Sequence, residues 1–259
     1  MVHPLLTQIV SSKTVLDKTG NPYALRGEIS QEEGDFLWNL IRTKNIEKTI
    51  EVGCAFGISS LHICDALSTK AQPHHVILDP YQSSYWHGVG IANLDRAGFG
   101  FYEFIEKPSE IALPELMAEG RSFDLAFVDG GHVFDLTIMN FLYLSKMVRV
   151  GGYIVFDDCG WPEIRRAMRF IVSNYPEFEV VGIVGNDKTS IKRKILDTVK
   201  MIANRGAALV PRKHAREFFS DEVLHHKRHM EIRGGMIALN KVSQSAVDPP
   251  RMRPDGKVR

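Results

Sequence analysis

TIEVGCAFGISSLHICDAL, the stretch from residue 49 to residue 67, decides the fold. An apolar run ends at Val52, Gly53 opens a short turn that reaches Gly57, and a segment of helical composition follows at once. Glycine at both positions lets the backbone approach a bound molecule without a Cβ atom, and the first amides of a helix are unpaired donors with partial positive charge. The stretch therefore predicts a strand, a ligand-binding turn and a helix.

Short apolar runs alternate with longer segments of helical period from Lys48 onward. Parallel strands that are buried on both faces are continuously apolar, and the runs VILD, LAFVD and YIVFD fit that pattern. The alternation predicts an α/β domain with a mainly parallel sheet. The predicted strands are residues 48–54, 74–80, 101–107, 124–130, 151–158, 178–184 and 234–242.

Helix start signals precede several of the periodic segments. Ser30 followed by Glu33 is a capping-box pattern that opens a helix through FLWNLIRTK, ahead of the first strand of the sheet. Pro162 suits the first turn of a helix, where its missing N–H costs nothing. Helices are expected to start near Ile58, Ser84, Ile111, Phe134 and Pro162.

Length and composition favour one domain. The chain has 259 residues, of which 44% are apolar and 24% charged, which is ordinary for a protein with a full core. We expect an N-terminal extension (1–29), a catalytic domain (30–242) and a flexible, Pro-rich tail (243–259). Within the domain, residues 187–229 form a predicted helical insertion rich in Lys and Arg, which would serve as a lid, an anionic-substrate patch or a dimer surface.

Net charge, cysteine content and the lack of a targeting signal limit the binding partners, the metal sites and the location expected for this chain. The formal charge of +1 gives no global field for nucleic acid or anionic lipid, so nucleic acid is not expected as a partner unless a local patch supplies the charge. Cys54, Cys64 and Cys159 are too few for a disulfide framework and lack zinc-site spacing. No secretory signal or membrane-spanning stretch is evident, which favours a cytoplasmic location.

The glycine turn is one half of a predicted nucleotide-type site, and Asp79 is the other. The spacing G-x-x-x-G, with an acid at Glu51, differs from the G-x-G-x-x-G of nicotinamide-binding proteins. Asp79 ends the second strand, where a carboxylate can accept both hydroxyls of a ribose. A structural turn with a surface acid is the alternative interpretation.

These motifs resemble those of the class I S-adenosylmethionine-dependent methyltransferases, and among them the metal-dependent O-methyltransferases of the catechol type and of macrolide and aminocoumarin sugars. The resemblance covers roughly residues 22 to 185 and the final strand. It implies a Rossmann-like α/β fold with a seven-stranded, mostly parallel sheet, helices on both faces and an antiparallel last strand. It also implies S-adenosyl-L-methionine as cofactor and a small-molecule acceptor with a hydroxyl, such as a diol, catechol or sugar.

The same resemblance places residues around the cofactor. Ser59 would donate to the carboxylate of the methionine end, and Asp79 would hold the ribose. The segment KPSEIALPEL (107–116) resembles the adenine-binding turn, although Lys107 and Pro108 replace small residues usual there, and a helix cap at Ser109 is the structural alternative. The implied cofactor residues are Glu51, Gly53, Gly57, Ser59, Asp79, Ser109, Glu110 and Asp129.

Acids end two further predicted strands, at Asp129 and at the pair Asp157 and Asp158. Three carboxylates at one sheet edge repel one another unless protons or a cation compensate, and oxygen ligands point to Mg²⁺ or another hard divalent ion. In the resembling enzymes such a cation chelates two acceptor oxygens, so these three acids are the predicted ligands. Asp158 stands where the catechol enzyme has Asn. Acids that cap helices or face solvent are the alternative.

His132 and Asp129 are the predicted catalytic residues. His132 stands where the catechol enzyme has its catalytic lysine, and histidine is the side chain best suited to accept a proton near neutral pH. Its alternative role is to order the loop. Trp161 is placed to contact an acceptor ring. Packing on the sheet is favoured for Tyr85, Trp86 and His87, and the alternative is that they form a wall of the cofactor or acceptor site.

Three other functions stay open at this stage. A nicotinamide-dependent oxidoreductase also needs a glycine turn and a ribose acid, a nucleic-acid methyltransferase would use the basic insertion to hold phosphates, and a binding protein would keep the pocket without turnover. A homodimer is also left open.

Overall fold

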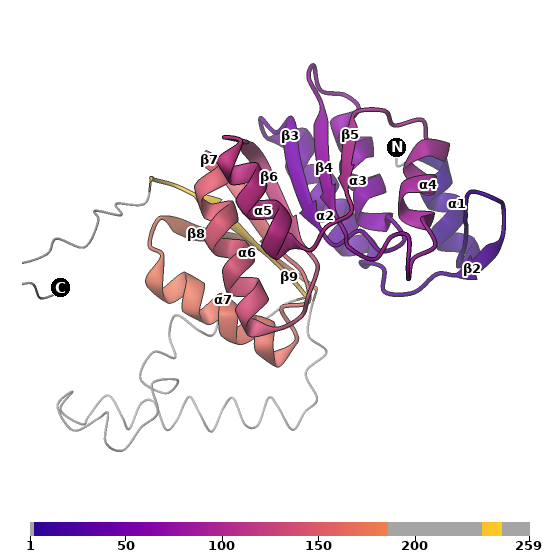
Figure 1. Ribbon diagram of the computed structural model, residues 1–259. Coiled ribbons are helices and arrows are strands. Elements are labelled where there is room, and N and C mark those ends of the chain that lie inside the picture. Colours follow the sequence, from indigo (N-terminus) through magenta and orange to yellow (C-terminus); the bar gives the residue numbers. More distant parts are fainter. Residues whose placement is uncertain (1–2, 186–234, 245–259) are drawn as a thin grey trace, which may run out of the picture.

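A computed structural model describes residues 3–185 and 235–244 (Figure 1). Seven strands form one sheet in the order β5-β4-β3-β6-β7-β9-β8, and β9 runs antiparallel to both of its neighbours while the other pairs are parallel. The strands are β3 (Lys48–Val52), β4 (His74–Leu78), β5 (Tyr102–Ile105), β6 (Phe123–Val128), β7 (Val148–Phe156), β8 (Phe178–Val184) and β9 (Met236–Lys241). The predicted Rossmann-like sheet with an antiparallel last strand is confirmed.

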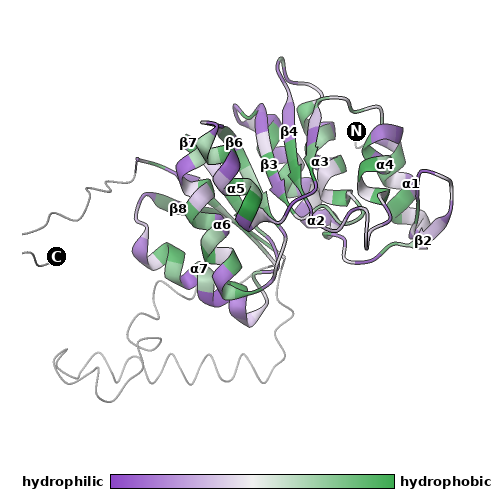
Figure 2. Cartoon of the chain, in the orientation of Figure 1, coloured by the Kyte–Doolittle hydropathy of each residue, from purple (hydrophilic) through white to green (hydrophobic). Residues whose placement is uncertain are grey.

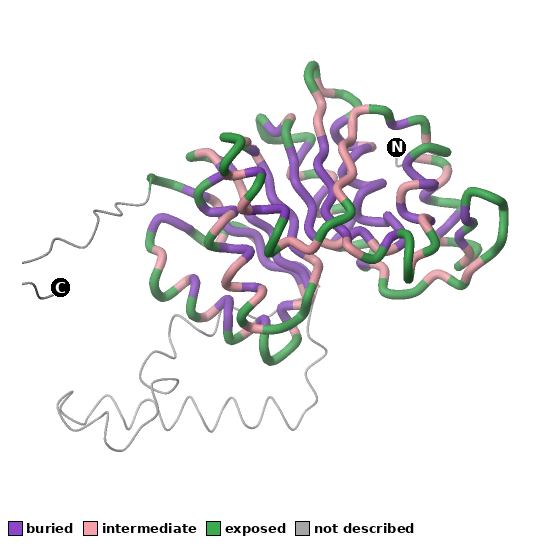
Figure 3. The backbone as a smooth tube through the Cα atoms, in the orientation of Figure 1, coloured by how far each residue is buried: buried purple, intermediate pink, exposed green. Residues whose placement is uncertain are grey.

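Helices cover both faces of this sheet. One face carries α5 (Ser109–Ala118), α6 (Phe134–Met147) and α7 (Pro162–Asn174), and the other carries α2 (Gln31–Thr43), α3 (Ile58–Leu67) and α4 (Val89–Arg96) (Figure 1). Apolar and polar residues both occur along these helices (Figure 2). The central strands and the helix residues that face them are buried (Figure 3). Each face therefore has its own apolar core.

Helix starts agree with the sequence at three of five positions, since α3, α6 and α7 begin at Ile58, Phe134 and Pro162. The expected helix at Ser84 begins only at Val89, because His87 and Gly88 adopt positive φ angles of 56° and 67° that a helix cannot contain.

Two other helices start at or close to an expected position. The expected helix near Ile111 begins at Ser109, after Pro108 in an extended conformation. The capping box of Ser30 and Glu33 opens α2 as predicted.

The N-terminal segment adds elements that the sequence did not predict. It forms α1 (Pro4–Ser12) and a hairpin of β1 (Thr14–Leu16) and β2 (Pro22–Ala24). The carboxylate of Asp17 accepts the backbone N–H groups of Thr19 and Asn21 at 2.8 and 2.9 Å, which closes the hairpin turn. Leu6, Ile9 and Val15 are buried in the core shared with α2, α3 and α4.

Backbone hydrogen bonds tie the carboxyl ends of four strands into one edge. Gly53 N donates to Leu78 O at 2.8 Å, Asp129 N to Val52 O at 2.9 Å, and Asp157 N to Val128 O at 2.9 Å. The residues that follow β4, β3, β6 and β7 are therefore neighbours, as expected of a doubly wound sheet.

The predicted insertion at 187–229 lies outside the described residues, as does nearly all of the predicted tail at 243–259. Among the helices of the described ranges, none is long and apolar enough to cross a membrane.

Candidate functional site

The glycine turn after β3 depends on close backbone contacts. Gly53 has φ +91°, and a Cβ there would overlap the carbonyl oxygen of Asp129 at the end of β6. Gly57, the N-cap of α3, has φ +78°, and a Cβ there would lie 2.8 Å from the carbonyl oxygen of Gly90 in α4. Other residues would strain both positions, because L side chains rarely adopt these φ angles. The two glycines thus let the turn pack tightly against β6 and α4.

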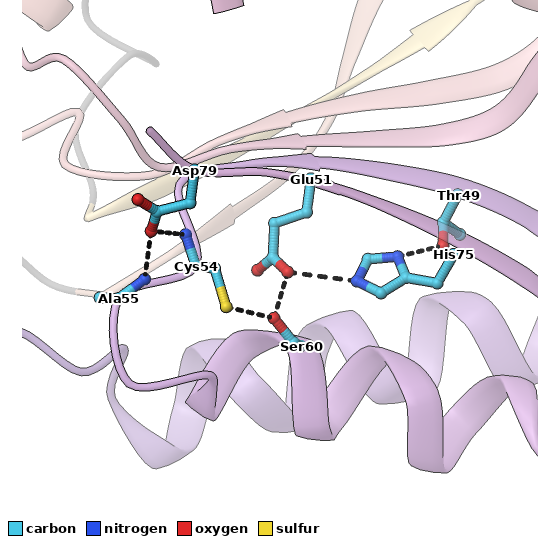
Figure 4. A network of polar contacts seen from close by, with 7 residues as sticks. All are labelled: Thr49, Glu51, Cys54, Ala55, Ser60, His75 and Asp79. Carbon is cyan, nitrogen blue, oxygen red and sulfur yellow. Dashed lines mark hydrogen bonds and ion pairs between the residues drawn. The ribbon is translucent and has the colours of Figure 1, made fainter. Parts of the chain in front are cut away.

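Asp79 holds this turn from the end of β4. Its Oδ2 accepts the backbone N–H groups of Cys54 and Ala55 at 3.0 and 2.9 Å (Figure 4). Its Oδ1 accepts the backbone N–H of Tyr81 at 2.8 Å. The side chain is buried, but it lines the main cavity. Because Oδ1 has one donor and two lone pairs, it can still accept a ligand hydroxyl.

One cavity of about 590 Å³ opens at the carboxyl edge of the sheet. Its volume falls in the range that small-molecule sites occupy. Seven predicted site residues line it, and they come from the ends of five strands: Gly53, Asp79, Ser109, Glu110, Asp129, His132 and Asp158. The structure therefore brings most of the predicted cofactor and acceptor residues to one place.

Four predicted residues do not line this cavity. Ser59 is buried and lines a small neighbouring pocket together with Asp129, and Asp157 lines another small pocket that also includes Asp129. Gly57 acts through the shape of the turn. Glu51 lies on the opposite side of β3 from its apolar neighbours Ile50 and Val52, facing α3.

Glu51 belongs to a buried polar network beneath the glycine turn (Figure 4). The hydroxyl of Ser60 in α3 donates to its Oε2, and Nε2 of His75 in β4 lies 3.2 Å from the same oxygen. Both ionisable side chains are completely buried. Glu51 can therefore act on a ligand in the cavity only indirectly, through the electrostatic field of its charge or through the shape of the turn above it.

The acidic end of the cavity gathers Asp129 and Asp158 with His132. One donor atom from each of the three lies within 4.8 Å of the others, and Nδ1 of His132 is 3.1 Å from Oδ2 of Asp158. Asp157 is not in this group, and one of its carboxylate oxygens accepts the N–H of Asp158 at 2.8 Å. Asp157 as a metal ligand stays a prediction.

Electrostatic repulsion is strong at this end. Burial, followed by the charges of Asp157 and Asp158, raises the pKa of Asp129 well above its usual range. Burial, followed by the charge of Glu33, raises the pKa of Asp157 to about 7. Two carboxylates and an imidazole at this spacing can hold a divalent cation, which would remove the repulsion.

Aromatic residues complete the walls. Trp161 lines the cavity as expected and stacks on His132 at a ring separation of 5.8 Å. Trp86, which the sequence assigned to packing, also lines it, whereas the exposed Tyr85 does not. Sequence reasoning missed Tyr81, although its position two residues after Asp79 was a signal. A flat or apolar acceptor would contact these rings.

The chain is similar in sequence to known O-methyltransferases. Residues 50–159 match a family described as a methyltransferase domain. A putative caffeoyl-CoA O-methyltransferase of Arabidopsis thaliana is 32% identical over 161 residues, covering 61% of this chain and 65% of the relative. A flavonoid 3',5'-methyltransferase of Vitis vinifera is 32% identical over 134 residues, covering 50% and 54%. The chain thus spans between about half and two thirds of these relatives.

The fold is also that of a solved O-methyltransferase. The enzyme from Bacillus cereus, crystallised with S-adenosylhomocysteine, superposes with a TM-score of 0.56 at 19% identity, over 68% of this chain and 82% of that one. The sequence matches thus support the predicted resemblance to O-methyltransferases, and the superposition shows that the fold is shared.

Proposed function

We propose that the protein is an S-adenosylmethionine-dependent O-methyltransferase that methylates a hydroxyl of a small molecule with the help of a divalent cation. One observation carries the proposal: a single cavity has the glycine turn and Asp79 at one end and the cluster of Asp129, His132 and Asp158 at the other. Under this proposal the donor and acceptor sites would lie side by side in one cavity. The similarity to O-methyltransferases supports the reaction class.

At the donor end, Asp79 would accept the ribose hydroxyls, and Ser109 and Glu110 would lie beside the adenine at the start of α5. Ser59 and Asp129 would contact the amino-acid end, since they line one small pocket next to the turn. A hydroxyl and a carboxylate suit the carboxylate and the ammonium group of that end.

At the acceptor end, Asp129 and Asp158, with Asp157 as the predicted third acid, would hold Mg²⁺ or a similar ion. When bound, such an ion would lower the pKa of an acceptor hydroxyl and fix its direction. His132 would take the hydroxyl proton on its imidazole, oriented by its contact with Asp158. Trp161 and Tyr81 would keep the acceptor against the donor, since methyl transfer is an in-line displacement that depends on alignment.

The donor set also allows an imidazole ligand. Mg²⁺ prefers oxygen ligands, whereas Mn²⁺, Co²⁺ and Ni²⁺ accept histidine nitrogen. Titration of the metal-stripped protein with these ions separates the two arrangements: a His132→Ala variant retains ion affinity when His132 is the base and loses it when His132 is a ligand.

Methyl transfer from radiolabelled S-adenosylmethionine to a panel of catechols, vicinal diols and sugars tests the proposal. We expect transfer to at least one acceptor class, its loss after EDTA treatment and its recovery with Mg²⁺ or Mn²⁺. Full activity in EDTA would refute the metal part. Cofactor binding without transfer to any acceptor would favour a binding protein.

A further inference from the structure

Two ionisable side chains, Glu51 and His75, lie in contact with no exposure to solvent, a rare arrangement for such groups. Nε2 of His75 is 3.2 Å from Oε2 of Glu51, and Nδ1 of His75 is 2.8 Å from the hydroxyl of Thr49. Thr49 and His75 are register partners on β3 and β4. Thr49, His75 and Glu51 therefore form a row of polar contacts between the neighbouring strands β3 and β4, and the row ends beneath the glycine turn (Figure 4).

Two forms of the His75 ring allow Nε2 to donate to Oε2 of Glu51. If the hydroxyl of Thr49 donates to Nδ1, the ring is neutral and its N–H lies on Nε2, facing Glu51. If the ring is charged, Nδ1 donates to Thr49 and Nε2 still carries a proton. In both of these forms Oε2 of Glu51 accepts the Nε2–H of His75 together with the hydroxyl of Ser60, so two donors meet at this one oxygen.

The other carboxylate oxygen of Glu51, Oε1, has no hydrogen-bond partner among the described residues, although it is fully buried. Such an oxygen costs free energy because it has lost water without gaining a donor. It points away from His75 and Ser60, toward the side of the turn at Cys54 (Figure 4). The charge of Glu51 also contributes to the raised pKa of Asp129, so its field reaches the cavity.

We propose that His75 is a positioning residue for the cofactor: it holds Glu51 as an ionised counter-charge beneath the turn, and this charge favours the cationic methyl donor. The inference rests on the proposed function, because it takes the ligand to be S-adenosylmethionine. The donor carries one positive charge more than its product, S-adenosylhomocysteine, since loss of the methyl group neutralises the sulfonium. His75 thus helps the site to distinguish the two through Glu51.

Calorimetric titration of both compounds into wild type and variants tests this role. His75→Leu removes the N–H donor at similar volume, and we expect it to weaken binding of S-adenosylmethionine by about tenfold and that of S-adenosylhomocysteine by no more than about threefold. His75→Gln can still present an N–H to Glu51 and should restore most of the wild-type ratio of the two affinities.

His62 provides a matched control. It is also buried, at 1% exposure, but lies on α3 with its ring packed on Gly34, and no contact with Glu51 is found in the described part of the chain. His62→Gln should lower stability without changing the affinity ratio. A change in the ratio as large as that of His75→Leu would show that any buried histidine has this effect, which overturns the proposal.

The possible outcomes distinguish failure of the proposed role of His75 from failure of the proposed function. Equal weakening of both ligands by His75→Leu would mean a purely structural role and would overturn it. If His75→Leu fails to fold, Thr49→Val is the deciding variant, because it removes the hydroxyl that fixes the proton on Nε2 of His75. A loss of affinity of about threefold for S-adenosylmethionine alone supports the proposal. An unchanged ratio of the two affinities refutes it. Wild type that binds neither compound would instead contradict the proposed function.

Discussion

The two ends of the cavity differ in how their charged side chains are stabilised. At the donor end, Asp79 accepts three backbone N–H groups, and Oε2 of Glu51 accepts two side-chain donors. At the acidic end, Asp129 and Asp157 have raised pKa values and His132 is exposed. The carboxylate of Asp79 at the first end is balanced by hydrogen bonds within the protein, whereas the charges at the second end oppose one another.

This difference suggests that the two ends were built for different kinds of ligand. A turn held by backbone hydrogen bonds is rigid before anything binds, which suits a cofactor of fixed shape. Carboxylates that repel one another store unfavourable energy that a cation releases on binding. Substitutions that change one end at a time can therefore separate the two roles.

Asp129→Asn should have the largest effect, because Asp129 lines the cavity and both small pockets beside it. The substitution removes a charge without changing size. We expect kcat/KM for methyl transfer to fall by about 1000-fold. Initial rates over a range of Mg²⁺ concentrations measure this fall in kcat/KM. Recovery of full activity at high Mg²⁺ would show that Asp129 contributes only affinity for the ion.

Gly53→Ala should disturb the junction between the two ends. The new Cβ would overlap the carbonyl oxygen of Asp129, and φ is positive there. We expect the free energy of unfolding to drop by roughly 2 to 4 kcal/mol, with loss of cofactor binding. Gly98→Ala is the control, since it also has positive φ but no atom near the new Cβ. Equal destabilisation by both would assign the effect to φ alone.

His132→Ala should act on catalysis alone if the imidazole is the base. We expect kcat to fall by about 10- to 100-fold while the affinity for S-adenosylhomocysteine is unchanged. Single-turnover rates measure the chemical step directly. Unchanged rates would leave His132 with the structural role of stacking on Trp161.

Asp157→Asn should stabilise the metal-free protein at alkaline pH. The folded pKa of about 7 lies above the usual 3.8, so the folded state binds a proton that the unfolded state releases, and stability falls as pH rises through this window. Asn keeps the neutral form, and we expect Tm at pH 8 to rise by roughly 2 to 4 °C, with little change at pH 4. A lower Tm at pH 8 would contradict the repulsion described above.

The sequence predicted the sheet because its signal is local. Val76, Ile77 and Leu78 form a continuous apolar run that is typical of a strand buried on both faces, and the same holds for the ends of β6 and β7. The N-terminal hairpin was missed because its strands have three residues each, too short for a period. The turn around Asp17 and Asn21 was the readable signal.

The sequence predicted which strand ends form the site, but not the direction of every side chain. Strand ends place residues at one edge, which brought Asp79, Asp129 and Asp158 to the same cavity. The direction of each side chain depends on backbone geometry that one sequence does not specify. Asp158 has φ +54° and points into the cavity with His132, whereas its neighbour Asp157 lies apart from that cluster.

A crystal structure of the protein grown with S-adenosylhomocysteine and Mn²⁺ would show whether the cofactor and the metal ion share this cavity. The account predicts the nucleoside between Asp79 and Ser109 and an anomalous scattering peak within coordination distance of the carboxylates of Asp129 and Asp158. Nucleoside density outside this cavity, or a filled cofactor site with no metal peak at these acids, would contradict it.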